Sequence, residues 1–303
     1  MTERPPFPKI LDSTMIASFR SCPNRFYREY IQHWKSKDPS VHLVAGGAYA
    51  KGLEVARVAY YQDGMLAEDA IAKGLMALMH AYGDFECPPD SAKSLERTAG
   101  AFEYYFTQYP LGSDAATPIT LPSGDKGVEF SFAEPTDATH PVTGDPILYV
   151  GRMDMICDYA GGVFGLDDKT TSSLGASWPK QWDLRSQFTG YCWGAGRANL
   201  PLQGFLVRGL SILKTKYDTM QAVTFRPAWM IDRWYEQLLR DIERMKQMWE
   251  SGVWDYSLDH ACTEYSGCAF RQVCLSLDPQ PWLEGSFSRR IWNPLLREEE
   301  VVS

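Results

Sequence analysis

Apolar and polar positions follow a helical period along the first third of the chain. In four stretches the apolar residues recur every three or four positions, the spacing that places them on one face of an α-helix. We therefore predict helices over residues 13–34, 46–64, 65–83 and 91–110. The first should open on a Ser/Thr cap and break near Pro23, whose ring cannot continue a helix interior.

The pattern changes beyond this region, where short stretches with a period of two predict β-strands. The predicted strands cover residues 127–135, 147–159, 162–170, 202–213 and 220–227. A helix is expected between the third and fourth strands, at residues 182–199, and a long amphipathic helix follows at residues 228–252. This order predicts an α/β fold with one mixed central sheet flanked by helices.

Composition narrows the class of protein. The 303 residues are 45% hydrophobic, enough for a sizeable core, and the formal net charge is −8. An acidic chain is a poor candidate for a protein that coats DNA over its whole surface, because neutralising phosphates needs Lys and Arg. We see no apolar leader and no long apolar run, so we expect no membrane span. An odd number of cysteines, seven, favours a reducing cytoplasm over a secreted disulfide framework.

Acidic residues interrupt two of the apolar strands. Asp154 lies on one strand, and Asp167, Asp168 and Lys169 lie on the next, across a Gly-Gly turn. Residues two apart in a strand share a face, so Asp167 and Lys169 should point one way and Asp168 the other, with Asp154 able to reach Asp167. Gathered carboxylates are costly to desolvate unless a cation compensates, and oxygen ligands suit Mg²⁺ or Mn²⁺. A surface hairpin with a simple ion pair is the alternative.

A glutamine and a tyrosine follow on the next predicted helix. Gln187 and Tyr191 are four residues apart, which places both side chains on one helix face. Such side chains can bind a phosphate or stack on a base. Taken alone, the pair is better explained as a partly buried polar face.

Together these residues resemble the motifs of the PD-(D/E)XK nuclease superfamily in its RecB-like branch. The branch has Gly-x-x-Asp, Asp-x-Lys-Thr and Gln-x-x-x-Tyr in this order, and the chain has "GRMD", "DDKT" and "QFTGY". The resemblance implies a restriction-endonuclease-like sheet and a metal-dependent DNA exonuclease that acts on single-stranded ends. It implies that Mg²⁺ or Mn²⁺ is held by Asp154, Asp167 and the backbone carbonyl of Asp168, that Lys169 assists the attacking water, and that Gln187 and Tyr191 hold the strand.

The resemblance extends to both ends of the chain, which read "SFRSCPNRFYREY" and "CTEYSGCAFRQVC". This four-cysteine layout is similar to that of the CRISPR-associated RecB-like exonucleases and of the iron–sulfur nuclease domain of AddB. It implies a [4Fe–4S] cluster that clasps the ends of the chain, held by Cys22, Cys262, Cys268 and Cys274. The first C-terminal spacing is longer than usual, so a four-thiolate zinc site is the main rival, and buried cysteines without a metal remain the third possibility.

One position departs from the branch. Its members usually carry a metal-binding histidine in a Gly-x-x-x-His-x-x-x-Glu helix, and aligning that glutamate with Glu54 places Ala50 at the histidine position. A catalytically weak nuclease, or an inactive DNA-binding or assembly subunit of the same fold, is therefore the second hypothesis. Glu129, on the strand before the hairpin, could reach the site, although we expect it to be an exposed strand residue. A zinc-clasped adaptor without a nucleic-acid role is the third.

We expect one integrated domain with three parts. These are a helical N-terminal region that carries the first clasp cysteine, a nuclease core, and a long helix with the three-cysteine clasp, at residues 1–115, 116–226 and 227–303. The expected partners are DNA, chiefly single-stranded ends, and other proteins of DNA processing, with no membrane.

Overall fold

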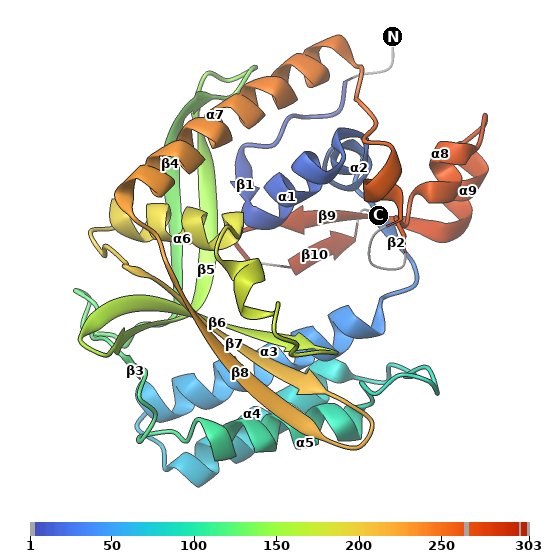
Figure 1. The fold of residues 1–303 in the computed structure, drawn as a ribbon. Coiled ribbons are helices and arrows are strands. Elements are labelled where there is room, and N and C mark those ends of the chain that lie inside the picture. The colour runs from blue at the N-terminus through green and yellow to red at the C-terminus, as the bar shows by residue number, and fades with distance from the viewer. Residues whose placement is uncertain (1–3, 264–266, 297, 302–303) are drawn as a thin grey trace. The chain divides into compact units, whose positions relative to one another are not determined.

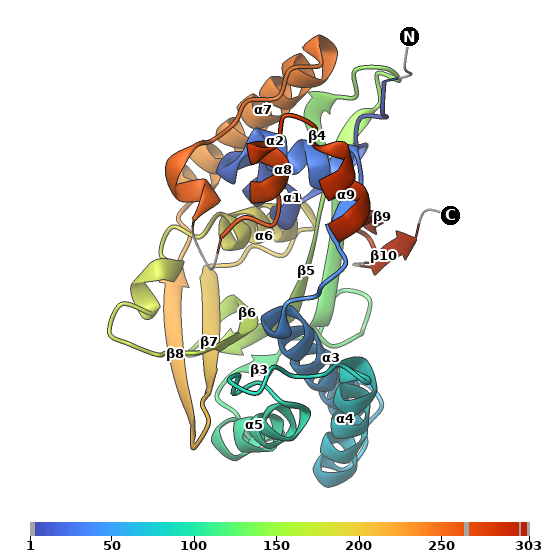
Figure 2. The ribbon, with the colours of Figure 1, turned by 90° about the vertical axis from the view of Figure 1, so that its right-hand side faces the viewer.

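The chain folds into two compact units that are each assembled from separate stretches of sequence. The computed structural model describes residues 4–263, 267–296 and 298–301 (Figures 1 and 2). Unit 1 comprises residues 1–38, 132–151 and 229–303, and unit 2 comprises residues 39–131 and 152–228. Two strands, β4 (Val128–Thr139) and β5 (Pro146–Tyr159), run from one unit into the other.

Three helices form one layer of unit 2. They are α3 (Val41–Tyr61), α4 (Ala67–Tyr82) and α5 (Leu95–Gln108). The side chains of Ser40 and Ser94 cap α3 and α5 by accepting backbone N–H bonds, which satisfies donors that a helix start leaves free. Helices α3 and α4 approach closely at Gly74, where a Cβ would lie 2.6 Å from a backbone oxygen of α3.

The helical layer covers one face of the sheet in unit 2. Strand β5 pairs antiparallel with β6 (Gly162–Thr171), which pairs parallel with β7 (Gly204–Ile212), and β7 pairs antiparallel with β8 (Tyr217–Phe225). The short β3 (Thr117–Pro118) also pairs with β5. Leu210 and Ile212 of β7 share a buried core with α3, α4 and α5, and Figure 2 shows these helices together beside the β7–β8 hairpin.

Helix α6 (Ser186–Arg197) lies in the connection between the parallel strands β6 and β7, after a short 3₁₀ turn, η2 (Pro179–Trp182). Its Phe188 stacks on Phe205 of β7 with ring centroids 4.7 Å apart. Side chains alternate between the two faces of a strand, so Phe205 points to the opposite face of β7 from Leu210 and Ile212. Helix α6 therefore packs on the face of the sheet that the three-helix layer leaves uncovered.

Unit 1 begins with β1 (Ile10–Asp12), which pairs parallel with the first half of β5. Helix α1 (Ser13–Ser21) follows, then α2 (Pro23–Phe26) and a π-helical turn, η1 (Tyr27–Ile31). The long helix α7 (Ala228–Ser251) buries one face through Trp234, Leu238 and Ile242 among others.

A second, three-stranded sheet lies in unit 1. Strand β9 (Phe287–Asn293) pairs antiparallel with β2 (Trp34–Ser36) and with β10 (Glu298–Val301). The short helices η3 (Asp259–Cys262), α8 (Arg271–Leu275) and α9 (Gln280–Ser286) precede it.

The structure confirms the predicted α/β class, with a mixed sheet flanked by helices. Every predicted helix and strand is found near its expected place, and α1 and α2 break at Pro23 as expected. The cap of α1 was predicted wrongly, because the Asp12 side chain, and not a Ser or Thr, accepts the N–H of Met15. The sequence analysis missed the second sheet. No helix in the described ranges is both long and apolar enough to cross a membrane.

Candidate functional site

The β5–β6 hairpin brings together the acids and the lysine that interrupt its strands. The antiparallel register, continued one step away from the turn, places Asp154 opposite Asp167. Lys169 forms an ion pair with Asp167. The backbone N–H of Asp168 donates a hydrogen bond of 2.8 Å to Oδ2 of Asp154, which fixes that carboxylate against the neighbouring strand. These side chains lie together as the strand pattern predicted, while their chemical roles stay a prediction.

The side chain of Asp168 has a different environment. Its Oδ2 lies 2.7 Å from a guanidinium nitrogen of Arg57 on α3, and the two side chains are only 2% and 4% exposed. Arg57 also donates a 2.7 Å hydrogen bond to the hydroxyl of Tyr105 on α5. Since a buried charge needs a partner, this ion pair ties the β5–β6 hairpin to the helical layer behind it.

A second buried arginine extends this network. Arg208 of β7 pairs with both carboxylate oxygens of Asp114, at 2.6 and 2.7 Å, and donates to the Tyr105 hydroxyl at 3.2 Å. Such two-point pairing is the geometry in which an arginine holds a carboxylate most firmly. The sequence analysis singled out neither arginine, although Arg57 follows Glu54 by three residues and therefore lies on nearly the same face of α3.

Lys169 is held in its charged form. Burial acts to lower the pKa of its ammonium, but the negative charges of Asp167 and Asp154 outweigh burial, so the pKa is raised. A lysine with a raised pKa is a poor base near neutral pH. It is suited to donating hydrogen bonds and to stabilising negative charge on an oxygen.

The carboxylates around Asp154 repel one another. Burial, followed by the charge of Asp167, raises the pKa of Asp154. The pKa of Glu129 is raised to about 8, first by burial and then by the charge of Asp154, although Arg152 opposes the shift. Glu129 was expected to be exposed, and that expectation is wrong: its side chain is only 16% exposed and lies 3.2 Å from Arg152.

Helix α3 contributes Glu54 to the carboxylates near Asp154. At the position aligned with the histidine of the RecB-like branch, the helix carries Ala50. Arg152 lies 3.9 Å from Glu54 as well as beside Glu129, so it bridges the two carboxylates. Glu54 also pairs with Lys51 at 2.6 Å. Ala50, one helical turn earlier, is exposed and has no side-chain atom that could bind a metal.

Gln187 and Tyr191 lie on one face of α6 as predicted. Gln187 Nε2 donates a 3.0 Å hydrogen bond to the Tyr191 hydroxyl, and the Tyr191 ring is buried. Tyr191 also contributes to raising the pKa of Lys169, after Asp167 and Asp154, which places its hydroxyl near the hairpin site. The structure therefore brings the pair together with Lys169.

The donor set fits a divalent cation that prefers oxygen. Asp167 Oδ1 is buried and has no hydrogen-bond partner among the described residues, apart from its ion pair with Lys169. Within the same residues, no three His, Cys, Asp or Glu side chains are already arranged around one metal position. Lys169 and Arg152 instead neutralise the carboxylates. A cation among them would relieve the repulsion that raises the pKa of Asp154.

Comparison with known proteins identifies the family. The PD-(D/E)XK nuclease superfamily profile matches residues 13–275, most of the chain. The chain belongs to the PD-(D/E)XK nuclease superfamily. The matched range includes the hairpin acids, Lys169, Gln187 and Tyr191, so the superfamily assignment and the site geometry rest on the same part of the chain.

Two solved structures are similar to the chain at low sequence identity. A crystal structure described as "Putative exonuclease" from Eubacterium rectale is 13% identical, with a TM-score of 0.49 over 85% of this chain and 88% of that chain. The structure of SSO0001 is also 13% identical, with a TM-score of 0.29 over 66% and 74% of the two chains. No curated protein sequence matches this chain.

In unit 1 of this superfamily member, the four predicted clasp cysteines line one small hollow. The N–H of Ser257 donates to Cys22 Sγ at 3.5 Å, and the N–H of Cys268 donates to the Cys262 carbonyl at 3.1 Å. Burial raises the pKa of the Cys274 thiol, and the other three cysteines raise it further. All seven cysteines are free thiols, so the hollow is not closed by disulfides.

The side chains of this hollow are suitable metal ligands, but the space between them is small. Four thiols are the donor set of an iron–sulfur cluster and equally of a structural zinc ion. The free volume between the walls is about 30 Å³, roughly the share of a single water molecule. Among the described residues no three of these cysteines already surround one metal position. A single ion would therefore need the side chains to turn toward it, and a four-iron cluster would need the walls to move apart.

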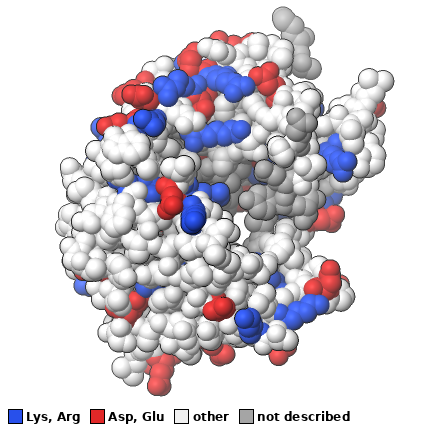
Figure 3. All heavy atoms as spheres, viewed as in Figure 1, with Lys and Arg blue, Asp and Glu red and all other residues white. Residues whose placement is uncertain are grey.

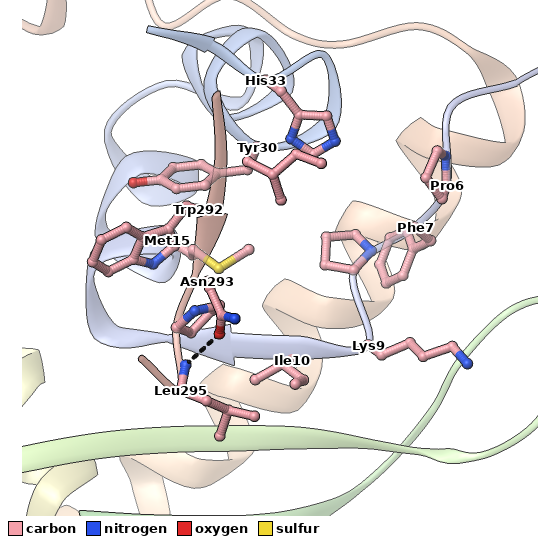
Figure 4. Close-up of a pocket in the computed structure, with 13 residues that line it drawn as sticks. Pro6, Phe7, Lys9, Ile10, Met15, Tyr30, His33, Trp292, Asn293 and Leu295 are labelled. Atoms are coloured by element: carbon pink, nitrogen blue, oxygen red, sulfur yellow. Dashed lines mark hydrogen bonds between the residues drawn. The ribbon is translucent and has the colours of Figure 1, made fainter. Parts of the chain in front are cut away.

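A second cavity in unit 1 is apolar and carries none of the predicted site residues. It has a volume of about 410 Å³. Figure 4 shows Met15, Tyr30 and Trp292 around it, with Lys9 at its edge. Its lining contains no carboxylate or cysteine, so it offers neither of the metal chemistries described above.

The surface of α7 is of mixed charge. Arg240 pairs with Glu236, and Lys246 pairs with Glu243, along its exposed side. Figure 3 shows Lys and Arg side chains interspersed with Asp and Glu over this helix. Such a face is typical of a solvated helix rather than of a continuous nucleic-acid track.

Proposed function

We propose that the protein is a metal-dependent DNA exonuclease of the RecB-like branch, which hydrolyses phosphodiester bonds at single-stranded ends. The observation that carries the proposal is the convergence of Asp154, Asp167 and Lys169 on one hairpin of a chain that belongs to a nuclease superfamily. Nucleases of this superfamily generally use divalent metals, and the oxygen-rich donor set agrees with that chemistry.

Asp154, Asp167 and the backbone carbonyl of Asp168 would hold Mg²⁺ or Mn²⁺. When bound, such an ion supplies Lewis-acid stabilisation of the phosphate and lowers the pKa of a bound water. Lys169 stays protonated beside Asp167, so its ammonium would stabilise charge on the phosphate and orient the attacking water by donating a hydrogen bond. The buried Arg57–Asp168 pair would fix the strand segment between these residues.

Gln187 and Tyr191 would hold the nucleic-acid strand against the hairpin. The hydrogen bond between them leaves the second amide hydrogen of Gln187 available to a phosphate oxygen. The face of α6 that they share lies next to Lys169, so a strand held there would reach the ammonium.

We further propose that Cys22, Cys262, Cys268 and Cys274 hold a metal clasp in unit 1. Their arrangement around one hollow supports four-thiolate ligation. The resemblance to the RecB-like branch favours a [4Fe–4S] cluster, and the small free volume favours zinc. The clasp would be structural, because it ties α1–α2 to the C-terminal segment within unit 1.

The central test compares the wild type with Lys169→Ala on end-labelled single-stranded DNA in Mn²⁺, after anaerobic purification. We expect cleavage by the wild type and a loss of at least about a hundredfold in the variant, with an unchanged melting temperature. Lys73→Ala, an exposed lysine of α4, is the matched control and should cut normally. Full activity of Lys169→Ala would refute the assignment of this site.

A second candidate is an inactive DNA-binding or assembly subunit that works with other proteins of DNA processing. The observation that favours it is Ala50, which leaves α3 without the ligand that the branch usually supplies. This candidate predicts that the folded wild type binds DNA ends without cutting them in Mn²⁺. Restoring the ligand with Ala50→His should then produce activity, whereas the exonuclease proposal predicts activity before that change.

A further inference from the structure

A buried lysine in unit 2 lines a cavity at the end of strand β6. Lys93 lies in the loop before α5 and is only 4% exposed. Within the described ranges no carboxylate lies at ion-pair distance from it, and its Nζ has one long contact, 3.5 Å, with the Thr170 hydroxyl. Burial, with no opposing charge to offset it, lowers the pKa of Lys93. A buried ammonium with so little compensation indicates a place for an anion.

The cavity around Lys93 has room and charge for such an anion. Its volume is about 630 Å³. Besides Lys93 its lining includes His42, Lys214 and the polar residues Ser91 and Ser172, against a single acid, Asp90. The first turn of α3, at residues 41–42, also faces the cavity. The start of a 21-residue helix carries partial positive charge, which adds to the attraction for an anion, although Ser40 already accepts the N–H of His42.

The position of the cavity connects it to the hairpin site. Thr170 directly follows Lys169 in β6, and Ser172 lies just beyond the strand end. Thr170 and Ser172 have the strand parity of Asp168, so the cavity lies on the opposite face of β6 from Lys169 and is reached around the end of the strand. A chain of phosphates bound at the hairpin could therefore place a neighbouring phosphate here.

We propose that this cavity is a phosphate subsite, in which Lys93 and Lys214 bind a phosphate group of the nucleic-acid strand other than the one being cut. The proposal rests on the exonuclease function proposed above, and it extends the substrate contact beyond the hairpin. The phosphate can be a terminal phosphate or an internal one of the backbone. The same chemistry serves both, so the experiment must separate them.

The test measures binding in the absence of cleavage. Three single-stranded oligonucleotides of one sequence, with a 5′-phosphate, a 3′-phosphate or no terminal phosphate, are titrated in chelator against the wild type and Lys93→Met. We expect about tenfold weaker binding by the variant. The slope of log K against log salt should fall by about 0.7, the value for one lost contact to a single strand. A loss confined to one phosphorylated end identifies a terminal phosphate, and an equal loss on all three identifies an internal one.

Two further variants keep the result interpretable. Lys214→Met removes an exposed lysine of the same cavity and cannot leave a buried hole, so it should weaken binding in the same direction. Lys73→Met, on the exposed side of α4, should bind as the wild type does. Unchanged affinity and salt slope in both cavity variants would overturn the subsite.

The cavity can also be tested separately from the exonuclease proposal. If the wild type does not bind DNA at all, thermal melting in inorganic phosphate tests the cavity directly. Stabilisation of the wild type by phosphate, absent in Lys93→Met, would support the subsite without a nuclease role. No stabilisation of the wild type would reject it.

Discussion

The hairpin site of unit 2 and the cysteine hollow of unit 1 solve the same physical problem in different ways. Each gathers groups that repel one another when they are ionised. At the hairpin, Lys169 and Arg152 already neutralise the carboxylates, and Arg57 neutralises Asp168 behind them. In the hollow four thiols line one space, and burial, as the first cause, raises the pKa of the Cys268 and Cys274 thiols.

The two sites should also differ in whether a bound metal is needed to fix the positions of their side chains. The hairpin lies on regular strands that pair along their length, so its side chains are positioned before any metal arrives. The hollow is lined by short helices and loops around residues 256–262 and 268–274 instead of by paired strands. We therefore expect the hairpin site to keep its geometry without metal, and the hollow to depend on one.

The largest expected effect comes from removing a clasp ligand. Structural zinc sites supply about 10 kcal/mol of apparent binding energy that acts as folding energy, so Cys22→Ser should lose the metal and much of the stability of unit 1. Metal content per chain, melting temperature and hydrogen exchange of residues 256–274 measure this. Cys87→Ser, a partly exposed cysteine outside the hollow, is the control. Equal metal content and equal melting temperatures in the wild type and Cys22→Ser would disprove the clasp.

The next largest effect concerns the buried ion pair of unit 2. Arg57→Met leaves Asp168 buried without its partner and should cost about 3–5 kcal/mol of unfolding free energy. Arg57→Lys should recover only part, since a lysine cannot reproduce the planar contact with both Asp168 and the Tyr105 hydroxyl. Urea midpoints measure both.

The matched control lies on an exposed face. Arg240 and Glu236 form an i, i+4 pair on α7 in which both side chains are about two-thirds exposed, at 67% and 68%. Arg240→Met should change the unfolding free energy by less than about 1 kcal/mol. Equal costs for the two arginines would mean that the Arg57–Asp168 pair does not stabilise unit 2, and that the hairpin is not held from behind.

The comparison also shows what the sequence could predict. Asp154, Asp167 and Lys169 could be predicted as neighbours because acids and a lysine interrupt apolar strands, and strand alternation fixes which of them share a face. The same rule led us to expect that Glu129 is exposed, which is wrong. It has a positive φ of 53°, so the alternation breaks at this residue and turns the side chain inward.

Long-range pairing accounts for the other failures. The second sheet joins residues 34–36 to residues 287–289, and strands of such length carry too little periodicity to be recognised. The contact of Arg57 with Asp168 depends on how α3 crosses β6, which no local pattern encodes. The four cysteines were grouped only through the family resemblance. They line one hollow in the structure, and their binding of a metal stays a prediction.

A smaller effect is expected from the pH dependence of the metal-free hairpin. The pKa of Glu129 is about 8 in the folded protein against an ordinary value of 4.5 for a glutamate, so between these values the folded state holds a proton that the unfolded state has released. Stability from this group is complete below about pH 4.5 and is lost as the pH rises toward 8, at up to about 1.4 kcal/mol per pH unit. Urea midpoints in chelator at several pH values measure the slope.

Glu129→Gln isolates this contribution, because the amide resembles the neutral acid and does not titrate. The variant should lose the falling slope and be more stable than the wild type at pH 8, while Glu236→Gln on exposed α7 should follow the wild type. An unchanged slope in Glu129→Gln would show that Glu129 is not part of the repelling group around Asp154. The hairpin would then be less crowded with charge than the hollow is.

The smallest effect is expected at α6, where the hairpin site meets the proposed strand. Tyr191→Phe removes one hydroxyl, leaves the ring packed near Phe205, and costs one hydrogen bond with Gln187, about 0.5–1.5 kcal/mol. Binding of single-stranded DNA in chelator should weaken up to about tenfold, with little change in melting temperature. Tyr104→Phe on α5 is the control.

A double-mutant cycle then asks whether the pair acts as a unit. If the Tyr191 hydroxyl positions the amide of Gln187 for a phosphate, Gln187→Leu and the double variant should bind DNA equally weakly, because the second change removes a group whose partner is already gone. Additive losses would mean that each side chain contacts the strand independently. No loss in any of the three would confine the pair to packing in unit 2, and strand binding would have to be sought at Lys93 instead.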